Sequence, residues 1–108
     1  MGNMNQDVFR EIALSFAGAI EKSHMTHPDF RAGKKQLIYA SLGSPTTEWG
    51  MVKLTPEQQA ALIESDSEVF QPCSGAWGQR GYTNVKLQNA SKKVIKIALQ
   101  LAYENVTI

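Results

Sequence analysis

The sequence predicts a single α+β domain, in which an antiparallel sheet has helices packed on one of its faces. Three observations lead to this fold class: a helical apolar period near the N-terminus, strand-like segments joined by short turns in the middle, and a second helical period at the C-terminus. The predicted order of elements is α-β-β-β-α-β-(β)-α. The length of 108 residues suits one domain, which we expect to span residues 1–108 with its core at about residues 5–106.

The first element is an amphipathic helix, predicted over residues 5–22. Asn5 is a suitable N-cap, and Asp7 favours the positive end of the helix dipole. Residues 23–29 are polar, and Pro28 disfavours helix there, so we expect a connection. The helix prediction rests on apolar residues that recur every four positions, namely Val8, Ile12, Phe16 and Ile20.

Three strands are predicted in the middle of the chain. A Gly-Lys-Lys turn at residues 33–35 and a Gly-Ser-Pro loop at residues 43–47 separate the strand-like segments. Because these connections are short, neighbouring strands are expected to be antiparallel. The predicted strands cover residues 30–32, 36–42 and 48–54.

The second half of the chain opens with a strong helix start. Thr55 is an N-cap, Pro56 suits the first helical turn, and Gln58 completes a capping box. We therefore expect a helix from residue 55 to about residue 65. A short strand at 69–70, a glycine-rich loop at 72–81 and a strand at 82–87 are expected to follow.

The last element is a C-terminal helix. Either Asn89 or Ser91 is expected to cap it. Its core face is expected to carry Val94, Ile97, Ala98 and Leu101.

Alternation along the strands separates an aliphatic face of the sheet from a face that is aromatic and basic. The aliphatic face is expected to be buried under the helices. On it lie Ile38, Val52, Leu54, Val85 and Leu87, which are expected to pack against Ile12, Phe16, Ile97 and Leu101. The opposite face is expected to carry Tyr39, Trp49, Met51, Lys53, Tyr82 and Lys86.

Composition and charge indicate which compartment and which kinds of partner to expect. The formal net charge of +1 does not by itself indicate a polyanion partner. Cys73 is the one cysteine, which excludes an intrachain disulfide and favours a reducing compartment. The N-terminal residues do not resemble a signal peptide, and no apolar run is long enough to span a bilayer. We therefore expect a cytoplasmic protein without a membrane partner.

No catalytic or metal-binding motif is present, so the chain is not expected to be an enzyme or to bind a cofactor. His24 and His27 have H-x-x-H spacing with Asp29 nearby, but a zinc site needs three or four ligands, and surface or hydrogen-bonded histidines are the expected alternative. Cys73 next to a histidine would be a nucleophile, whereas a lone cysteine is more often inert.

The glycine-rich loop has two interpretations. Gly75, Gly78 and Gly81 recur every three residues, which suits either a tight connection or a binding loop that presents Trp77 and Arg80. Basic residues near aromatic residues favour contact with phosphates while bases stack. We expect the two tryptophans and three neighbouring cations to form one solvent-reachable region, made of Trp49, Lys53, Trp77, Arg80 and Lys86.

Three stretches together resemble the MmcQ/YjbR family. They are the run from His27 to Arg31 followed by Gly33-Lys34, the run from Trp49 to Gln59, and the stretch from Pro72 through Trp77 to Thr83. The resemblance covers about residues 8–106. It implies a CyaY-like or secretion-chaperone-like antiparallel fold. The pattern positions without an assigned role are His27, Asp29, Gly78, Gly81 and Thr83.

The resemblance also implies a function, because members of the family are described as DNA-binding through a double-wing arrangement, with no catalytic residues. The leading hypothesis is therefore a DNA-binding module that uses the aromatic and basic sheet face and the glycine-rich loop. One alternative is a protein-interaction or homodimerisation domain on the same face, and another is a small-ligand site at the Trp77 loop. The binding residues expected are Arg31, Tyr39, Trp49, Lys53, Trp77, Arg80 and Lys86.

Overall fold

The computed structural model describes residues 6–43 and 46–107. A six-stranded antiparallel sheet has the strand order β1-β2-β3-β4-β6-β5, so the α+β prediction is confirmed. The elements are α1 (Gln6–Leu14), β1 (Ile20–His24), β2 (His27–Ala32), β3 (Leu37–Leu42), β4 (Trp49–Lys53), α2 (Pro56–Ser65), β5 (Phe70–Pro72), α3 (Gly75–Gln79), β6 (Tyr82–Lys86), the 3-10 helix η1 (Leu87–Asn89) and α4 (Lys92–Thr107).

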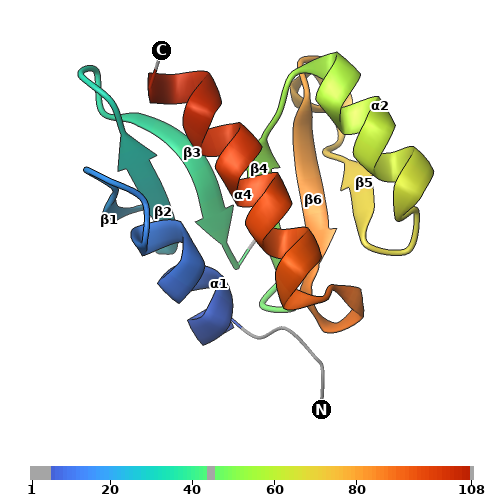
Figure 1. Cartoon of the computed structure of the whole chain (residues 1–108), viewed down its shortest axis with the longest axis horizontal. Coiled ribbons are helices and arrows are strands. Elements are labelled where there is room, and N and C mark those ends of the chain that lie inside the picture. The colour runs from blue at the N-terminus through green and yellow to red at the C-terminus, as the bar shows by residue number, and fades with distance from the viewer. Residues whose placement is uncertain (1–5, 44–45, 108) are drawn as a thin grey trace.

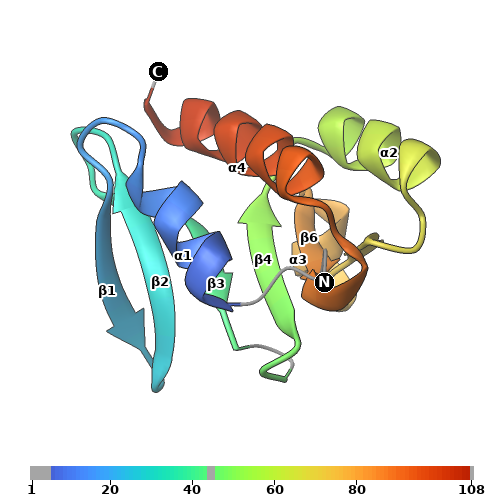
Figure 2. The same cartoon turned by 60° about the horizontal axis from the view of Figure 1, so that its bottom comes forward.

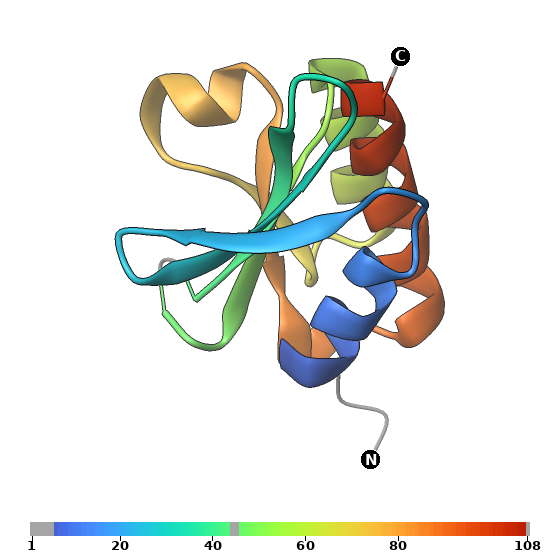
Figure 3. The same cartoon turned by 90° about the vertical axis from the view of Figure 1, so that its left-hand side faces the viewer.

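Helices cover one face of the sheet. In Figures 1 and 2, α4 crosses the middle of the sheet, with α1 on one side of it and α2 on the other. The short helix α3 and the β1–β2 hairpin instead project from the opposite face, as the side view in Figure 3 shows. This second face, called the open face below, is therefore bounded on two sides and bare in the middle.

The expected core is present between the sheet and the helices. Val52, Leu54, Val85 and Leu87 are buried as predicted. The prediction for Ile38 is wrong, because its half-buried side chain lies on the opposite face of the sheet. The prediction for Ile97 is wrong, because its side chain is 45% exposed. The helix α4 is rotated relative to the predicted face, since its buried residues are Ile95, Ala98, Leu99, Ala102 and Val106.

The N-terminal helix is shorter than predicted, and part of the predicted segment is a strand. Helix α1 ends at Leu14, and a turn follows in which Gly18 has a φ of +74°. Ile20 then begins β1, which pairs with β2 from Ile20–Arg31 to His24–His27. The polar connection predicted at residues 23–29 is accordingly a two-residue hairpin turn with a strand on each side.

Strand β3 contains an irregularity at Tyr39. Phe30 pairs with Ala40 and Arg31 pairs with Ile38, so Tyr39 is an extra residue opposite β2. Such a bulge interrupts the alternation of side chains. Tyr39 is therefore buried, and its hydroxyl donates a hydrogen bond to the carbonyl of Ala13 in α1. The prediction that Tyr39 lies on the open face is wrong.

The caps of α2 and α4 follow the sequence, whereas the predicted cap Asn5 lies outside the described residues. Thr55 and Gln58 form both hydrogen bonds of the capping box at the start of α2. At α4 the cap is Ser91, whose hydroxyl accepts a hydrogen bond from the Val94 amide. Asn89 instead donates to the Glu68 carbonyl. Within the described residues, no helix is both long and apolar enough to cross a membrane.

Candidate functional site

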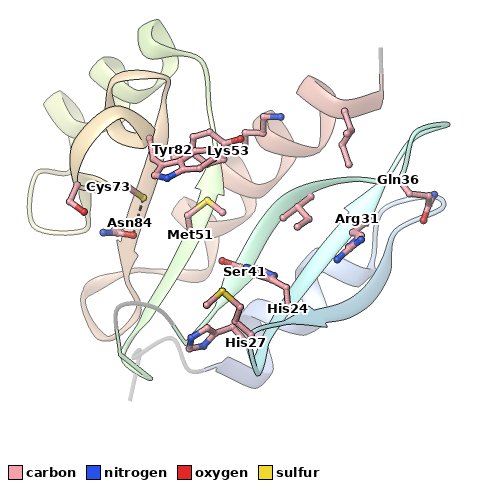
Figure 4. A pocket seen from close by; sticks show the side chains of 15 residues that line it. His24, His27, Arg31, Gln36, Ser41, Met51, Lys53, Cys73, Tyr82 and Asn84 are labelled. Atoms are coloured by element: carbon pink, nitrogen blue, oxygen red, sulfur yellow. Dashed lines mark hydrogen bonds between the residues drawn. The ribbon is translucent and has the colours of Figure 1, made fainter.

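The open face holds a cleft of about 830 Å³ between the β1–β2 hairpin and α3. Figure 4 shows its lining side chains converging from both sides over the strands β3, β4 and β6. The hairpin wall consists of His24, Met25, His27 and Arg31. The α3 wall consists of Cys73, Ser74, Trp77 and Tyr82, and the floor between them includes Ser41, Met51, Lys53 and Asn84.

Register explains why the floor residues lie side by side. Asp29 of β2 pairs with Ser41, Ser41 with Met51, and Met51 with Asn84. Directly opposed residues of antiparallel strands share one face of the sheet. A continuous row of side chains therefore crosses the open face from the hairpin to β6.

The hairpin wall is fixed by a buried carboxylate. Asp29 is fully buried and accepts hydrogen bonds from Arg31 Nε at 2.7 Å and from His24 Nδ1 at 2.7 Å. These contacts, chiefly the one from Arg31, hold the pKa of Asp29 below its ordinary value against the opposing effect of burial. The carboxylate stays charged and locks the direction of both cleft-lining side chains.

The α3 wall is an aromatic pair flanked by cations. The indole of Trp77 meets the ring of Tyr82 edge-on, with the centroids 5.1 Å apart. Lys53 Nζ lies 5.8 Å from the Tyr82 ring centre, and the Arg80 guanidinium lies 5.6 Å from that of Trp77. Trp77 is nevertheless 58% exposed. An ordered tryptophan face is thus available to a ligand, with positive charge beside it.

The charged side chains that line the cleft are cations. Among the described residues, no Asp or Glu side chain lines the cleft, which is lined by the cations Arg31 and Lys53. Arg31 is ion-paired with Asp29, and Lys53 has no carboxylate partner among the described residues. The helices of the other face carry charges of both signs, with Glu57 and Glu64 on α2 and Lys92, Lys93 and Lys96 on α4. The cleft is therefore suited to an anionic ligand despite the small net charge of the chain.

The predicted surface is only partly assembled. Lys53, Trp77 and Arg80 lie together with Tyr82, and Arg31 lies on the opposite wall of the cleft. Trp49 and Lys86 pair with each other at the far end of β4 and β6. Four residues of extended strand separate Trp49 from Lys53, roughly 13 Å, and neither Trp49 nor Lys86 lines the cleft.

Three of the family-pattern residues without an assigned role, namely Gly78, Gly81 and Thr83, have a structural role. A Cβ atom on Gly78 would lie 1.9 Å from the Cys73 carbonyl oxygen, and one on Gly81 would lie 2.0 Å from that of Leu54. Thr83 is buried, donates to the Gly81 carbonyl and accepts from the Gln59 amide. These three residues hold in place the segment with α3, which carries Trp77. His27 belongs to the hairpin wall, and Asp29 lies buried behind that wall.

Sequence reasoning missed Ser41 and Asn84 on the floor and Met25 on the hairpin wall. Alternation already places Ser41 and Asn84 on the open face, but the search for aromatic and basic residues passed over them. Met25 was hidden because the hairpin itself was not predicted. Cys73 also lines the cleft; its thiol donates to Asn84 Oδ1 over 3.2 Å, and burial raises its pKa.

His24 and His27 both line the cleft, but they are not part of a set of metal ligands among the described residues. His24 is bonded to Asp29, and within the described part of the chain no group of three His, Cys, Asp or Glu side chains is arranged to hold a metal ion.

Among known proteins, no family model matches this chain, and no curated protein matches it either. A solved structure that does match is the crystal structure of the Deinococcus radiodurans protein DR2400, which has a DUF419 domain. The two have a TM-score of 0.80 over 98% of this chain and 80% of that chain, with 16% sequence identity. The likeness shows that the two chains share a fold.

Proposed function

We propose that the open face binds single-stranded nucleic acid, with the base of one nucleotide stacked on Trp77. The observation that carries this proposal is the α3 wall, where Trp77 is exposed although Tyr82 and Arg80 contact its ring. A large aromatic side chain left in water is costly unless something covers it. Stacking on an aromatic platform is the common way in which proteins hold unpaired bases.

The charges around the cleft support the same ligand. Lys53 lies beside Tyr82 and has no carboxylate partner among the described residues, and the Arg80 guanidinium lies over the ring of Trp77. Cations in these positions would contact the phosphates on either side of a stacked base. A cleft without carboxylates avoids repulsion along the backbone.

The form of the cleft favours an unpaired strand over a duplex. Trp77 stands on a wall of the cleft, and the floor lies between two projecting walls. A base reaches such a platform only when it is unstacked and unpaired, which costs a duplex several kcal/mol, about the scale of base extrusion. The proposal therefore narrows the DNA-binding hypothesis to single strands, DNA or RNA.

We further infer that the chain is a member of the MmcQ/YjbR family and is not an enzyme. The three stretches that resemble the family support this, together with a fold shared with a DUF419 domain, a group related to that family.

Fluorescence anisotropy of a labelled oligothymidylate tests the proposed function. The wild-type protein should bind the single strand more tightly than a duplex of the same length. The variant Trp77→Ala should bind about tenfold more weakly or worse, since stacking contributes about 1–3 kcal/mol per base. Ile97→Ala removes an exposed apolar side chain on α4 and serves as the control, with unchanged affinity expected.

Two outcomes would contradict the proposal. Equal affinity for duplex and single strand would show that the strand is not read through an unpaired base. No binding to any oligonucleotide, combined with a concentration-dependent dimer in sedimentation equilibrium, would favour the protein-interaction alternative, whose interface should bury at least about 1,000 Å².

A further inference from the structure

We propose that the tip of the β1–β2 hairpin is a second contact for the bound strand, with Met25 packing against a base across the cleft from Trp77. This inference rests on the proposed function and adds to it a contact on the opposite wall. The hairpin tip and α3 project from the same face of the sheet (Figure 3), and Met25 and Trp77 both line the cleft between them.

The backbone of the hairpin turn is unusual for the residues that form it. His24 pairs with His27, so Met25 and Thr26 are the two central residues of the turn, and their φ angles are +48° and +69°. A two-residue turn with positive φ at both positions strongly favours Asn-Gly. Threonine is β-branched, which makes positive φ especially unfavourable for it. Met-Thr is therefore a poor choice for the stability of this turn.

The Met25 side chain gives a reason for this choice. It is 85% exposed, so the turn holds an apolar group in water without contributing to the core. Strained backbone that persists in a fold is often associated with a functional site. Methionine is also among the apolar side chains that insert between neighbouring bases in nucleic-acid complexes. Its flexible thioether adapts to different flat surfaces.

The rest of the hairpin is built to hold the tip still. Asp29 of β2 accepts a hydrogen bond from His24 of β1, which joins the two strands just behind the turn, and its carboxylate is also held by Arg31 of its own strand. Both histidines adjacent to the turn line the cleft. Rigid placement lowers the entropy cost of ordering a side chain when the ligand binds.

A set of three turn variants separates this contact from any effect on folding. Thr26→Gly relaxes the turn and keeps Met25. Met25→Asn improves the turn and removes the apolar side chain. The double variant Met25→Asn with Thr26→Gly gives the sequence that the turn geometry prefers.

The expected result is opposite changes in stability and binding. Thermal unfolding of the double variant should occur at a midpoint about 4 °C or more above that of the wild type. Its affinity for oligothymidylate should fall about fivefold to tenfold, as should that of Met25→Asn, since a methionine contact is lost. Thr26→Gly should bind like the wild type.

The outcomes that would overturn the inference differ from those for the proposed function. If Trp77→Ala loses affinity while Met25→Asn and the double variant bind like the wild type, the hairpin contact is wrong and the proposed function stands. If Thr26→Gly loses as much affinity as Met25→Asn, the shape of the turn matters and the Met25 contact is wrong. If the wild-type protein binds no oligonucleotide, both proposals fail.

Discussion

Arg31 grips the buried carboxylate of Asp29 with two of its nitrogens, Nε at 2.7 Å and a terminal guanidinium nitrogen at 3.1 Å. This pair lies within β2, and the hydrogen bond from His24 of β1 to the same carboxylate joins the two strands behind the hairpin turn. The hairpin wall therefore depends on one ionised group. That dependence leads to a prediction about stability and pH.

Asp29→Asn should destabilise the protein by about 2 kcal/mol at neutral pH, since it weakens hydrogen bonds to a charged group. The pKa of Asp29 is lower in the folded chain than its ordinary value of 3.8. Its stabilising contribution is therefore complete above that value and is lost as the pH falls through the lower folded pKa. Urea unfolding at a series of pH values should show this loss in the wild type and not in the variant. Asp7→Asn, at an exposed carboxylate, is the control.

Gly81→Ala should destabilise the protein by about 3 kcal/mol, since a Cβ there meets the Leu54 carbonyl and φ is +108°. Gly75→Ala provides a matched comparison, because its φ is +68° but the added Cβ would meet nothing within 4 Å. We expect a cost of about 1 kcal/mol for Gly75→Ala. Denaturant unfolding measures both. Equal costs would show that crowding against Leu54 is relieved by a small shift.

Lys53→Ala should lower the salt dependence of oligonucleotide binding. Each phosphate contact to a single strand contributes about 0.7 to the slope of log affinity against log salt. Removing Lys53 should therefore reduce the slope by about 0.7, whereas Lys93→Ala on α4 should leave it unchanged. Titrations at several salt concentrations measure the slope. The same reduction in both variants would indicate diffuse attraction instead of a contact in the cleft.

Cys73 should report on occupancy of the cleft. Burial raises the pKa of its thiol, so the reactive thiolate should become abundant only at a pH above that of an ordinary cysteine. The rate of iodoacetamide alkylation should rise with pH along this displaced curve. Saturating oligothymidylate should slow the reaction, because Cys73 lines the cleft. Unchanged alkylation in the presence of bound strand would place the ligand elsewhere.

Tyr39→Phe should cost about 1–3 kcal/mol, because it leaves the Ala13 carbonyl without its partner in a buried place. Tyr103→Phe removes a similar bond to the Ala17 carbonyl at a more exposed position, where water can replace the hydroxyl. We expect the second variant to be closer to the wild type in thermal unfolding. The reverse order would mean that the bulge in β3 does not need the Tyr39 hydroxyl.

The sequence predicted those parts of the fold in which local signals agree with the tertiary structure. The alternation of β4 and β6 correctly buries Val52 and Val85 and leaves Lys53 and Tyr82 on the open face. The capping box at Thr55 determined the start of α2. In each case the local pattern was enough to predict the structure, because no contact with a distant segment favours a different conformation.

The errors arise where pairing with a distant strand decides the conformation. Ile20 continues the four-residue period of α1, yet its segment pairs with β2 as an edge strand after a turn in which Gly18 has a φ of +74°. Tyr39 follows a regular alternation in the sequence, and the bulge appears only when β3 is aligned with β2. For the same reason, only part of the candidate site could be predicted from the sequence. Local patterns identify Trp77 and Lys53, whereas Met25 can be identified only after the β1–β2 hairpin is known.

The strand order makes the cleft a product of both halves of the chain. Its hairpin wall comes from residues before β3, its α3 wall from residues after α2, and only the pairing of β4 with β6 sets them opposite each other. The strands β1 to β4 are neighbours in chain order, so their pairing depends little on β5 and β6. Ligand binding is consequently a reporter of complete assembly. A chain whose second half has not docked would lack both the α3 wall and α4, the helix that packs on β2, β3 and β4. Supplying the missing half as a separate peptide should then restore the core and the binding activity together.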